Sequence, residues 1–408
     1  MQTATFWSIP FMNCEKKLKI CHVITRMVVG GAQENTLFTA LDHAEKDHDV
    51  TLVTGFSPGR EGELLQKAKL NSKLRIVETP TLCRELSLKN DPKAYFFLKR
   101  FFKENNFDVV HTHSSKAGII GRIAAWNAKV PFVVHTVHGQ AFHPFEKAWK
   151  NFIYKTAERY AAKKCHKIYA VAQAMINQCI EAKIAPAEKY MVVYSGMEIG
   201  DFLNAKKSPE LCQKLQIPSN APVIGSIARL FPLKGYEYFI PAAHALLQKR
   251  PDVHFLLVGD GSMHDELIEQ VKKLGIEKNI HFAGLVAPYE VPLYVGNMDL
   301  LWHFSVREGL PRSVVQALAA GKIPMSFALD GAPEVILNDL SGYTLPYRDD
   351  MDDVISEIAE KSEYLLNNPD VYKKMSDYGR ELVREKFDHH YMADVLEKEY
   401  LSGIDGAK

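Results

Sequence analysis

The 408-residue chain is too long for one hydrophobic core, and typical domain sizes predict two or three domains. Its 47% hydrophobic and 24% charged residues are ordinary for a soluble globular protein. No apolar run approaches the roughly 18 residues that a membrane span requires, so a membrane-spanning protein is excluded at this stage.

Charge is distributed unevenly along the chain, although the net charge is only +1. Residues 1–200 carry 28 Lys+Arg and 18 Asp+Glu, whereas the remainder carries 22 and 31. The basic first half predicts an anionic partner, either a membrane surface or a phosphate-bearing acceptor. Attraction between two domains of opposite charge is the alternative.

The apolar cluster Phe6–Met12 is short and has no basic residues before it. We therefore predict a disordered or surface-lying extension over residues 1–17, and not a signal peptide. The six cysteines form no C-x-x-C pair, which predicts reduced thiols in a cytoplasmic protein: Cys14, Cys21, Cys83, Cys165, Cys179 and Cys212. Peripheral association with the inner face of the membrane is expected if the basic half binds lipid. Nucleic acid is not an expected partner.

Short apolar runs alternate with amphipathic patterns in the first half, which is the signature of a parallel α/β domain. The predicted strands are Leu18–Thr25, Val50–Thr54, Val109–Thr112 and Phe132–Thr136. The predicted helices are near Gln33–Ala44, Lys93–Glu104, Lys116–Asn127 and Phe145–Lys164.

The same alternation occurs again in the second half, after a predicted linker at Gly196–Pro222. The predicted strands are Val223–Ile227, His254–Val258, Ile280–Ala283, Asp299–His303 and Ile323–Phe327. Helices are predicted near Tyr236–Gln248, His264–Leu274 and Ser313–Ala320. No short-period repeat is visible, which excludes solenoids and propellers.

Two such domains in tandem leave a cleft between the carboxyl ends of their sheets, where α/β proteins bind ligands. Gly30 and Gly31 follow the first strand and open a helix, so their backbone can approach an anion closely. The G-x-G-x-x-G dinucleotide fingerprint is absent here, and an ordinary strand-to-helix turn explains the glycine pair equally well.

Glu308 lies on the tight turn Gly309-Leu310-Pro311, before an alanine-rich helix. The N–H groups of that helix end and the carboxylate suit phosphates and sugar hydroxyls. Arg229 and Lys234 follow another strand, where their charges can hold a diphosphate and neutralise it as it leaves, without a metal. Together they predict a nucleotide-sugar site, although an isolated Arg-Lys pair on a loop is usually only solvated.

Histidines crowd into one part of the first half. The His111-Thr112-His113 sequence resembles the His-x-His of metal-dependent hydrolases, but further ligands at other strand ends are not evident and Lys116 would repel a cation. We therefore predict no metal site. His111 and His135 are expected either in the core or behind residues that contact the ligand. His138 ends a strand beside a glycine and is predicted to point into the cleft.

These motifs resemble those of a family-4 retaining glycosyltransferase of the GT-B fold, from about Lys19 to Phe387. The resemblance rests on Gly30-Gly31-Ala32, Thr136-Val137-His138-Gly139, Arg229 through Lys234-Gly235, Val258-Gly259-Asp260-Gly261, Glu308-Gly309-Leu310-Pro311 and Ala332-Pro333-Glu334-Val335. It implies α/β architecture with two Rossmann-like domains facing a central cleft. The implied divisions are an extension at 1–17, an acceptor-binding domain at 18–203, a nucleotide-sugar-binding domain at 204–385, and a crossover helix and tail at 386–408. The crossover helix is expected near Tyr391–Tyr400, and it is expected to cross back to the first domain.

The resemblance also implies an activity: transfer of a sugar, with its anomeric configuration kept, from a UDP- or GDP-sugar to a glycan or lipid-linked acceptor in polysaccharide or glycolipid synthesis. No cofactor is implied. The catalytic residues that we assign are Arg229, Lys234, Glu308 and His138, with His138 positioning the donor near the reacting carbon. The assigned donor-binding residues are Gly30, Gly31, Gly261, Gly309, Leu310, Pro311 and Gln316.

Gln316 departs from the family pattern, which has a second glutamate at this position, eight residues after the first. In the family that acid usually accepts a hydrogen bond from the nucleotide ribose. Gln316 can accept through its carbonyl oxygen but carries no charge, so a bond of about 1.5–3 kcal/mol becomes one of about 0.5–1.5 kcal/mol. We expect weaker donor binding, with the chemistry retained.

Two other functions fit these residues. One is a nucleotide-sugar epimerase or hydrolase on the same two-domain fold, and the other is a non-catalytic nucleotide-sugar-binding protein, suggested only by Gln316. The pairing of Glu308 with Arg229 and Lys234 favours a transferase, whereas an epimerase would act without an acceptor.

The predicted helix Phe145–Lys164 has two interpretations. Its apolar residues recur at helical spacing: Trp149, Phe152, Ile153, Ala157, Tyr160 and Ala161. With the lysines around them, this pattern is compatible with adsorption to anionic lipid. We predict instead that the stripe packs on the first sheet, because a Rossmann-type helix needs one apolar face.

Overall fold

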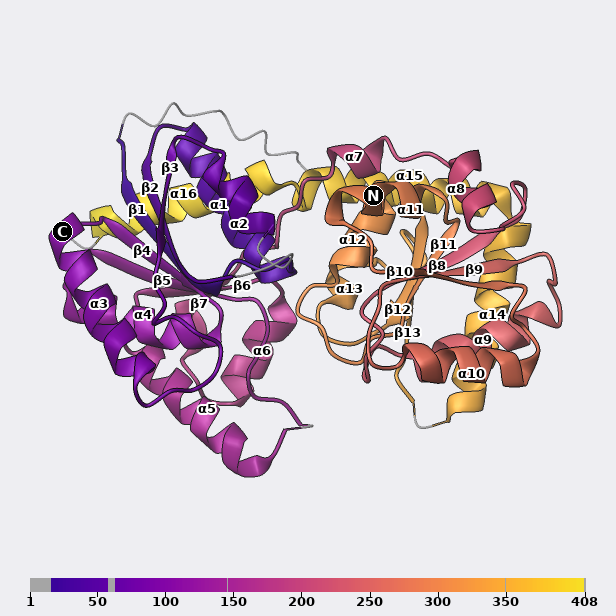
Figure 1. Cartoon of the computed structure of the whole chain (residues 1–408), viewed down its shortest axis with the longest axis horizontal. Helices are drawn as coiled ribbons and strands as arrows, with labels where there is room; N and C mark the ends of the chain where they lie inside the picture. Colours follow the sequence, from indigo (N-terminus) through magenta and orange to yellow (C-terminus); the bar gives the residue numbers. More distant parts are fainter. Residues whose placement is uncertain (1–15, 58–62, 145, 349, 407–408) are drawn as a thin grey trace, which may run out of the picture.

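The computed structural model describes residues 16–57, 63–144, 146–348 and 350–406. The apolar cluster Phe6–Met12 and most of the predicted extension lie outside the described residues. Two parallel sheets stand side by side, each in its own α/β domain (Figure 1). The strand orders are β3-β2-β1-β4-β5-β6-β7 and β10-β9-β8-β11-β12-β13, which confirms the predicted pair of Rossmann-like domains.

The first domain contains β1 (Lys19–Arg26), α1 (Gly31–Glu45), β2 (Asp49–Gly55), α2 (Glu63–Lys69), β3 (Leu74–Glu78), α3 (Asn90–Asn105), β4 (Val109–His113), α4 (Ser115–Asn127), β5 (Phe132–Val137), α5 (Ala148–Ala162), β6 (Lys167–Ala170), α6 (Gln173–Glu181), η2 (Ala187–Lys189) and β7 (Tyr190–Val192). Apolar strand residues are buried on both faces of the sheet, because α1 and α16 (His389–Gly406) cover one face and α3 to α5 cover the other.

The segment between the sheets holds α7 (Gly200–Leu203) and α8 (Pro209–Lys214). The second domain contains β8 (Val223–Ile227), α9 (Tyr236–Leu247), β9 (His254–Val258), α10 (His264–Leu274), β10 (Ile280–Gly284), η3 (Pro288–Glu290), α11 (Val291–Gly296), β11 (Leu300–His303), α12 (Arg312–Ala319), β12 (Ile323–Phe327), α13 (Ala332–Val335), β13 (Tyr343–Leu345), α14 (Met351–Asn367) and α15 (Pro369–Lys386). The division at 203/204 stays a prediction.

The last helix crosses back to the first domain, as predicted, and α16 is longer than the expected Tyr391–Tyr400 (Figure 1). It packs on α1, where Glu397 accepts hydrogen bonds from Lys46 at 2.5 Å and pairs with His48 at 2.8 Å. At its start, Asp42 of α1 pairs with His389 at 2.7 Å and with His390 at 2.9 Å. Polar contacts therefore fix both the beginning and the middle of the crossover helix.

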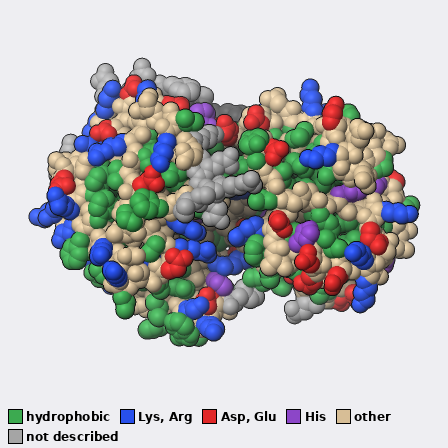
Figure 2. Space-filling model, viewed as in Figure 1, with side chains coloured by type: hydrophobic (Ala, Val, Ile, Leu, Met, Phe, Trp, Pro, Cys, Tyr) green, Lys and Arg blue, Asp and Glu red, His purple; other side chains and the backbone are tan. Residues whose placement is uncertain are grey.

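Helix α5 contradicts the prediction that its aromatic stripe packs on the first sheet. Ala161 and Ala162 are buried, but four large side chains are exposed: Trp149 (60%), Phe152 (69%), Ile153 (48%) and Tyr160 (54%). Hydrophobic side chains gather on the lower end of the first domain, where Figure 1 places α5 (Figure 2). The small residues Ala161 and Ala162 make the buried contact between α5 and the rest of the domain, and the large apolar residues face solvent.

The five cysteines within the described ranges form no disulfide with one another. None of the helices in those ranges combines the length and apolar character needed to cross a membrane.

We expect the His389–Asp42 contact to make stability depend on pH. Burial lowers the pKa of His389, but the bond to Asp42 and its charge outweigh burial and raise the pKa above its usual 6.5. The folded protein therefore holds this proton more tightly than the unfolded chain does. The resulting stabilisation is complete below about pH 6.5 and is lost as the pH rises through the raised pKa.

The variant His389→Gln should lose about 1.5–3 kcal/mol at pH 6, the usual range for a hydrogen bond to a charged group, and less at pH 8. Urea unfolding of both proteins at the two pH values measures this difference. His390→Gln is a matched control with a smaller expected loss, because the His390 side chain is 65% exposed. An equal loss for His389→Gln at both pH values would contradict the prediction.

Candidate active site

The cleft between the two domains brings most of the predicted site residues together. One cavity of about 460 Å³ is lined by Gly30, Gly31, His138, Lys234, Glu308, Gly309, Leu310 and Gln316. A second, of about 770 Å³, is lined by Arg229, Lys234, Glu308 and Gly309 on one side and by residues of α5 and α6 on the other. Lys and Arg side chains gather around this cleft (Figure 2).

Glu308 and Lys234 form an ion pair at the centre of the cleft, and both side chains are mostly buried. Burial raises the pKa of the Glu308 carboxyl, but the charge of Lys234 and its bond to the carboxylate outweigh burial and hold the pKa below its ordinary value. Glu308 is therefore a carboxylate at neutral pH. It can accept hydrogen bonds from hydroxyl groups of a ligand in the cleft.

His303, at the end of β11, is a site residue that the sequence analysis missed. Its Nδ1 lies 3.2 Å from the Ser313 hydroxyl, and its Nε2 lies 3.8 Å from Glu308 Oε1. Burial lowers the pKa of His303, so the ring is mainly neutral. The available signal was that His303 ends a predicted strand shortly before Glu308. The sequence does not show, however, that the His303 ring turns toward the Glu308 carboxylate.

Arg229 lies on the exposed loop after β8, with its guanidinium 5.1 Å from the ring centroid of Phe231. It lines both the 770 Å³ cavity and a further cavity of about 520 Å³. Gly261 lies behind this loop, where an added Cβ would come within 2.3 Å of the Leu230 carbonyl oxygen. Arg229 is thus free to contact a ligand, whereas Gly261 supports the loop and its direct donor contact stays a prediction.

Gly309 allows the two domains to meet. A Cβ added to Gly309 would lie 2.4 Å from the carbonyl oxygen of His138, closer than real Cβ contacts. The first domain thus brings His138 at the end of β5 against the turn that carries Glu308. Pro311 ends this turn and is the N-cap of α12. Gln316 on α12 lines the same cavity as Glu308 and can face a ligand there.

Several polar contacts join the domains around this point. Glu334 of the second domain accepts hydrogen bonds from the backbone N–H groups of Gln173 and Ala174, at 2.7 and 2.9 Å, and so caps α6. Asp330 accepts from the Glu308 N–H at 2.7 Å and from the Gln178 amide at 2.8 Å. These contacts hold the Glu308 turn at a fixed place relative to the first domain.

Two arginines beside the turn also bridge the domains. Arg312 pairs with Glu34 of α1, and Arg307 donates to the Gln140 carbonyl at 2.6 Å. The sequence analysis did not select either residue. Both are adjacent to the predicted motif, but their partners are more than 160 positions away in the chain.

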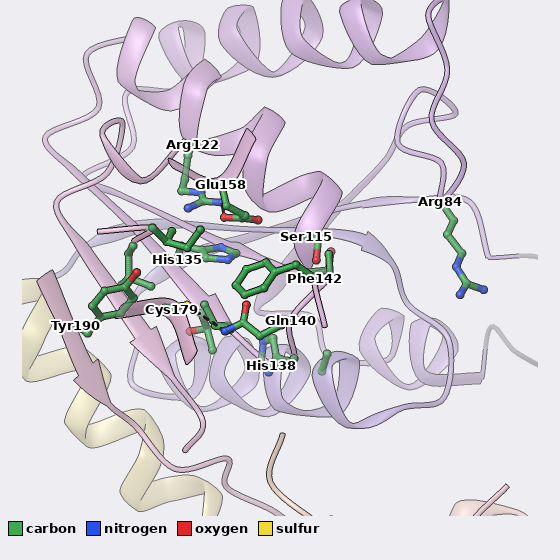
Figure 3. A pocket seen from close by; sticks show the side chains of 18 of the residues that line it. Arg84, Ser115, Arg122, His135, His138, Gln140, Phe142, Glu158, Cys179 and Tyr190 are labelled. Carbon is green, nitrogen blue, oxygen red and sulfur yellow. Dashed lines mark hydrogen bonds and ion pairs between the residues drawn. The ribbon is translucent and has the colours of Figure 1, made fainter. Parts of the chain in front are cut away.

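The 520 Å³ cavity extends from the cleft into the first domain (Figure 3). Arg122, with no exposed surface, pairs there with Glu158 at 2.6 Å, and Gln140 lies near Cys179. Figure 3 shows Phe142 between the Arg122–Glu158 pair and His138, with Arg84 well apart from these side chains. The 520 Å³ cavity therefore lies mainly within the first domain, and Arg229 of the second domain lines it as well.

Both halves of the chain match known glycosyltransferase families. Residues 207–382 match Glycosyl transferases group 1, and residues 29–200 match Glycosyltransferase Family 4. The chain is 30% identical over 341 residues to an Escherichia coli enzyme named UDP-Gal:alpha-D-GlcNAc-diphosphoundecaprenol alpha-1,3-galactosyltransferase, covering 83% of this chain and 86% of that protein. The chain belongs to the family-4 glycosyltransferases.

Two further comparisons agree with this assignment. The glycosyltransferase is 25% identical to the capsular polysaccharide biosynthesis glycosyltransferase CapM of Staphylococcus aureus, covering 78% of this chain and 82% of CapM. Its fold matches the crystal structure of Anabaena HepE in complex with UDP, with a TM-score of 0.77, 22% identity, and coverage of 94% of this chain and 100% of HepE. The predicted GT-B fold is confirmed.

In this glycosyltransferase, we expect Arg229→Ala and Lys234→Ala each to lower kcat by about 10²–10³-fold, the usual loss for one preorganised electrostatic donor. The midpoint temperature of thermal unfolding should change much less than kcat does for Arg229→Ala, because the Arg229 side chain is exposed. Lys273→Ala, at an exposed position on α10, is the control and should keep the wild-type rate. Normal rates for both cleft variants would show that neither cation stabilises the leaving group.

Proposed function

We propose that this glycosyltransferase moves a sugar, with retention of its anomeric configuration, from a nucleotide sugar to a glycan or lipid-linked acceptor. The observation that carries this proposal is the Lys234–Glu308 pair beside Arg229, in a cleft that also contains His138 of the other domain. Two comparisons favour a uridine nucleotide as the donor. HepE was crystallised with UDP, and the Escherichia coli relative is named for a UDP-Gal donor.

The chemistry follows from charge that develops as the diphosphate leaves. The bond from the anomeric carbon to the phosphate oxygen breaks, and negative charge builds on the diphosphate while the sugar becomes oxocarbenium-like. Arg229, Lys234 and the N-terminus of α12 can stabilise that charge as it forms. Glu308 accepts from sugar hydroxyls. The acceptor hydroxyl attacks from the face that the diphosphate leaves, so the new bond forms between its oxygen and the anomeric carbon, and its proton passes to the departing phosphate oxygen.

The acceptor side of the proposal rests on the first domain. The Escherichia coli relative is named for an acceptor on diphosphoundecaprenol. The 770 Å³ cavity runs from Glu308 to Asn151 and Lys155 of α5, the helix with exposed aromatic residues. A lipid-linked acceptor would therefore reach the cleft from the α5 side while its chain remains in a membrane. We assign the protein to the cytoplasm, at the inner face of the membrane.

A nucleotide-release assay separates the three candidate functions. The purified protein is incubated with a panel of UDP- and GDP-sugars, with and without lipid-linked sugar diphosphates, and free nucleotide and sugar products are measured. A transferase releases nucleotide only when an acceptor is elongated, with Glu308→Gln as the low-activity control. Turnover without acceptor would indicate an epimerase or hydrolase, and binding without turnover would indicate a non-catalytic protein.

Gln316→Glu should tighten donor binding by about 1 kcal/mol, or roughly fivefold, because it restores a charged acceptor for the ribose. Isothermal titration with the donor nucleotide measures the change, and thermal unfolding should differ little. If Gln316→Glu binds nucleotide more weakly, then Gln316 contacts another ligand group and its assignment to the ribose is wrong.

Membrane adsorption through α5 is testable by co-sedimentation with vesicles with and without phosphatidylglycerol. Trp149→Ser/Phe152→Ser should reduce binding to the anionic vesicles at least tenfold, since it removes two exposed apolar side chains. Tyr289→Ser is the matched control, because Tyr289 is 74% exposed on the second domain. Equal binding by all three proteins would place the membrane contact elsewhere.

A further inference from the structure

A row of hydrogen-bonded imidazoles leads from the cleft into the core of the first domain. His138 Nε2 lies 3.1 Å from His113 Nδ1, and His113 Nε2 lies 3.1 Å from His22 Nδ1. Neighbouring ring planes are inclined by 28° and 27°, and their centroids lie 5.4 and 5.3 Å apart. His138 borders the cleft, whereas His113 and His22 have no exposed surface.

All three rings are neutral at physiological pH. Burial lowers the pKa of His138 to about 3, with a further contribution from the nearby Arg312 charge. Burial also lowers the pKa of His113 and of His22 well below 6.5. A neutral imidazole has one N–H and one bare nitrogen, so the two bonds must run in the same direction along the row.

The buried end of the row selects the direction. Among the described residues, His22 Nε2 has no hydrogen-bond partner. If the bonds ran inward from His138, this nitrogen would be a buried N–H without an acceptor, which is a rarer and costlier state than a bare nitrogen. His22 Nδ1–H therefore donates to His113 Nε2, and His113 Nδ1–H donates to His138 Nε2.

Neighbouring histidines do not compete for these bonds. Both nitrogens of His111 are engaged by hydroxyls, Nδ1 by Tyr400 and Nε2 by Thr136. His135 Nδ1 lies 3.0 Å from both the hydroxyl and the carbonyl oxygen of Thr112. The predicted core positions of His111 and His135 are confirmed. His22, His111 and His113 could also converge on a metal ion, but these hydrogen bonds already account for His111 and His113.

We propose that His113, backed by His22, is a positioning residue that holds His138 as its Nδ1–H tautomer, so that His138 presents a hydrogen-bond donor to the cleft. The accepting atom is an oxygen of the bound sugar or diphosphate, and this part rests on the proposed function. To act as a base toward the cleft, His138 would need an unprotonated Nδ1. The hydrogen bonds along the row keep this nitrogen protonated. The ring orients the ligand and takes no proton from the acceptor.

The tautomer is measured directly in the resting protein. Histidine is labelled with ¹⁵N, long-range ¹H–¹⁵N spectra are recorded from pH 5.5 to 8, and His138 is assigned from the spectrum of His138→Gln. We expect a protonated Nδ1 and a bare Nε2 across this range. A protonated Nε2 in the wild-type protein, or titration of His138 near pH 6.5, would overturn the proposal whether or not any transferase activity is found.

Two substitutions test the part played by His113. His113→Leu removes the donor to His138 Nε2, and we expect a mixture of His138 tautomers and a fall in kcat/KM of about tenfold. His113→Asn keeps an amide N–H close to the position of Nδ1, so it should restore the Nδ1–H tautomer and most of the activity. If both variants keep the wild-type tautomer, His113 does not set it. The wild-type spectrum decides the tautomer even if His113→Leu fails to fold.

Discussion

The site depends on the close approach of two backbones, one from each domain. The His138 carbonyl of the first domain leaves no room for a side chain at Gly309, and the Gly309 carbonyl in turn leaves none at Gly331. Backbone contacts of this kind fix positions to within a few tenths of an ångström, because neither side has a flexible end that can yield. The acid on one side and the imidazole on the other therefore face the same small volume.

The ion pair at the centre of that volume has consequences for ligand binding. Lys234 is the near neighbour that balances the Glu308 carboxylate, and the pair is only about one-fifth to one-quarter exposed. Under the proposed function, the donor diphosphate would compete for Lys234, while sugar hydroxyls would replace Lys234 as partners of Glu308. The complete donor would then keep both charges satisfied, whereas free nucleotide would leave Glu308 without its cation. Such a site would favour the intact nucleotide sugar over the free nucleotide.

The sequence predicted the positions of strands correctly where a local run of apolar residues marks a buried strand. Strands β8, β9 and β12 were located to the residue, because a strand covered on both faces is a mainly apolar run. The half-buried edge strand β3 and the strands β6, β7 and β13, each of three or four residues, were missed, because they are too short or too polar to give such a run. The interdomain pairs could not be predicted, since Arg312 and Glu34 are 278 positions apart. Motif spacing locates a turn, but it does not show which distant carboxylate lies opposite it.

The error at α5 has a different cause. An amphipathic pattern shows that a helix has an apolar face, but not what covers it. Here Ala161 and Ala162 provide the close contact with the domain, and the large residues Trp149, Phe152 and Tyr160 face outward. A cluster of large exposed apolar residues on one helix of a basic domain favours aggregation unless something covers it. The same helix borders the 770 Å³ cavity, so under the proposed function a membrane that covers α5 would also hold a lipid-linked substrate near the cleft.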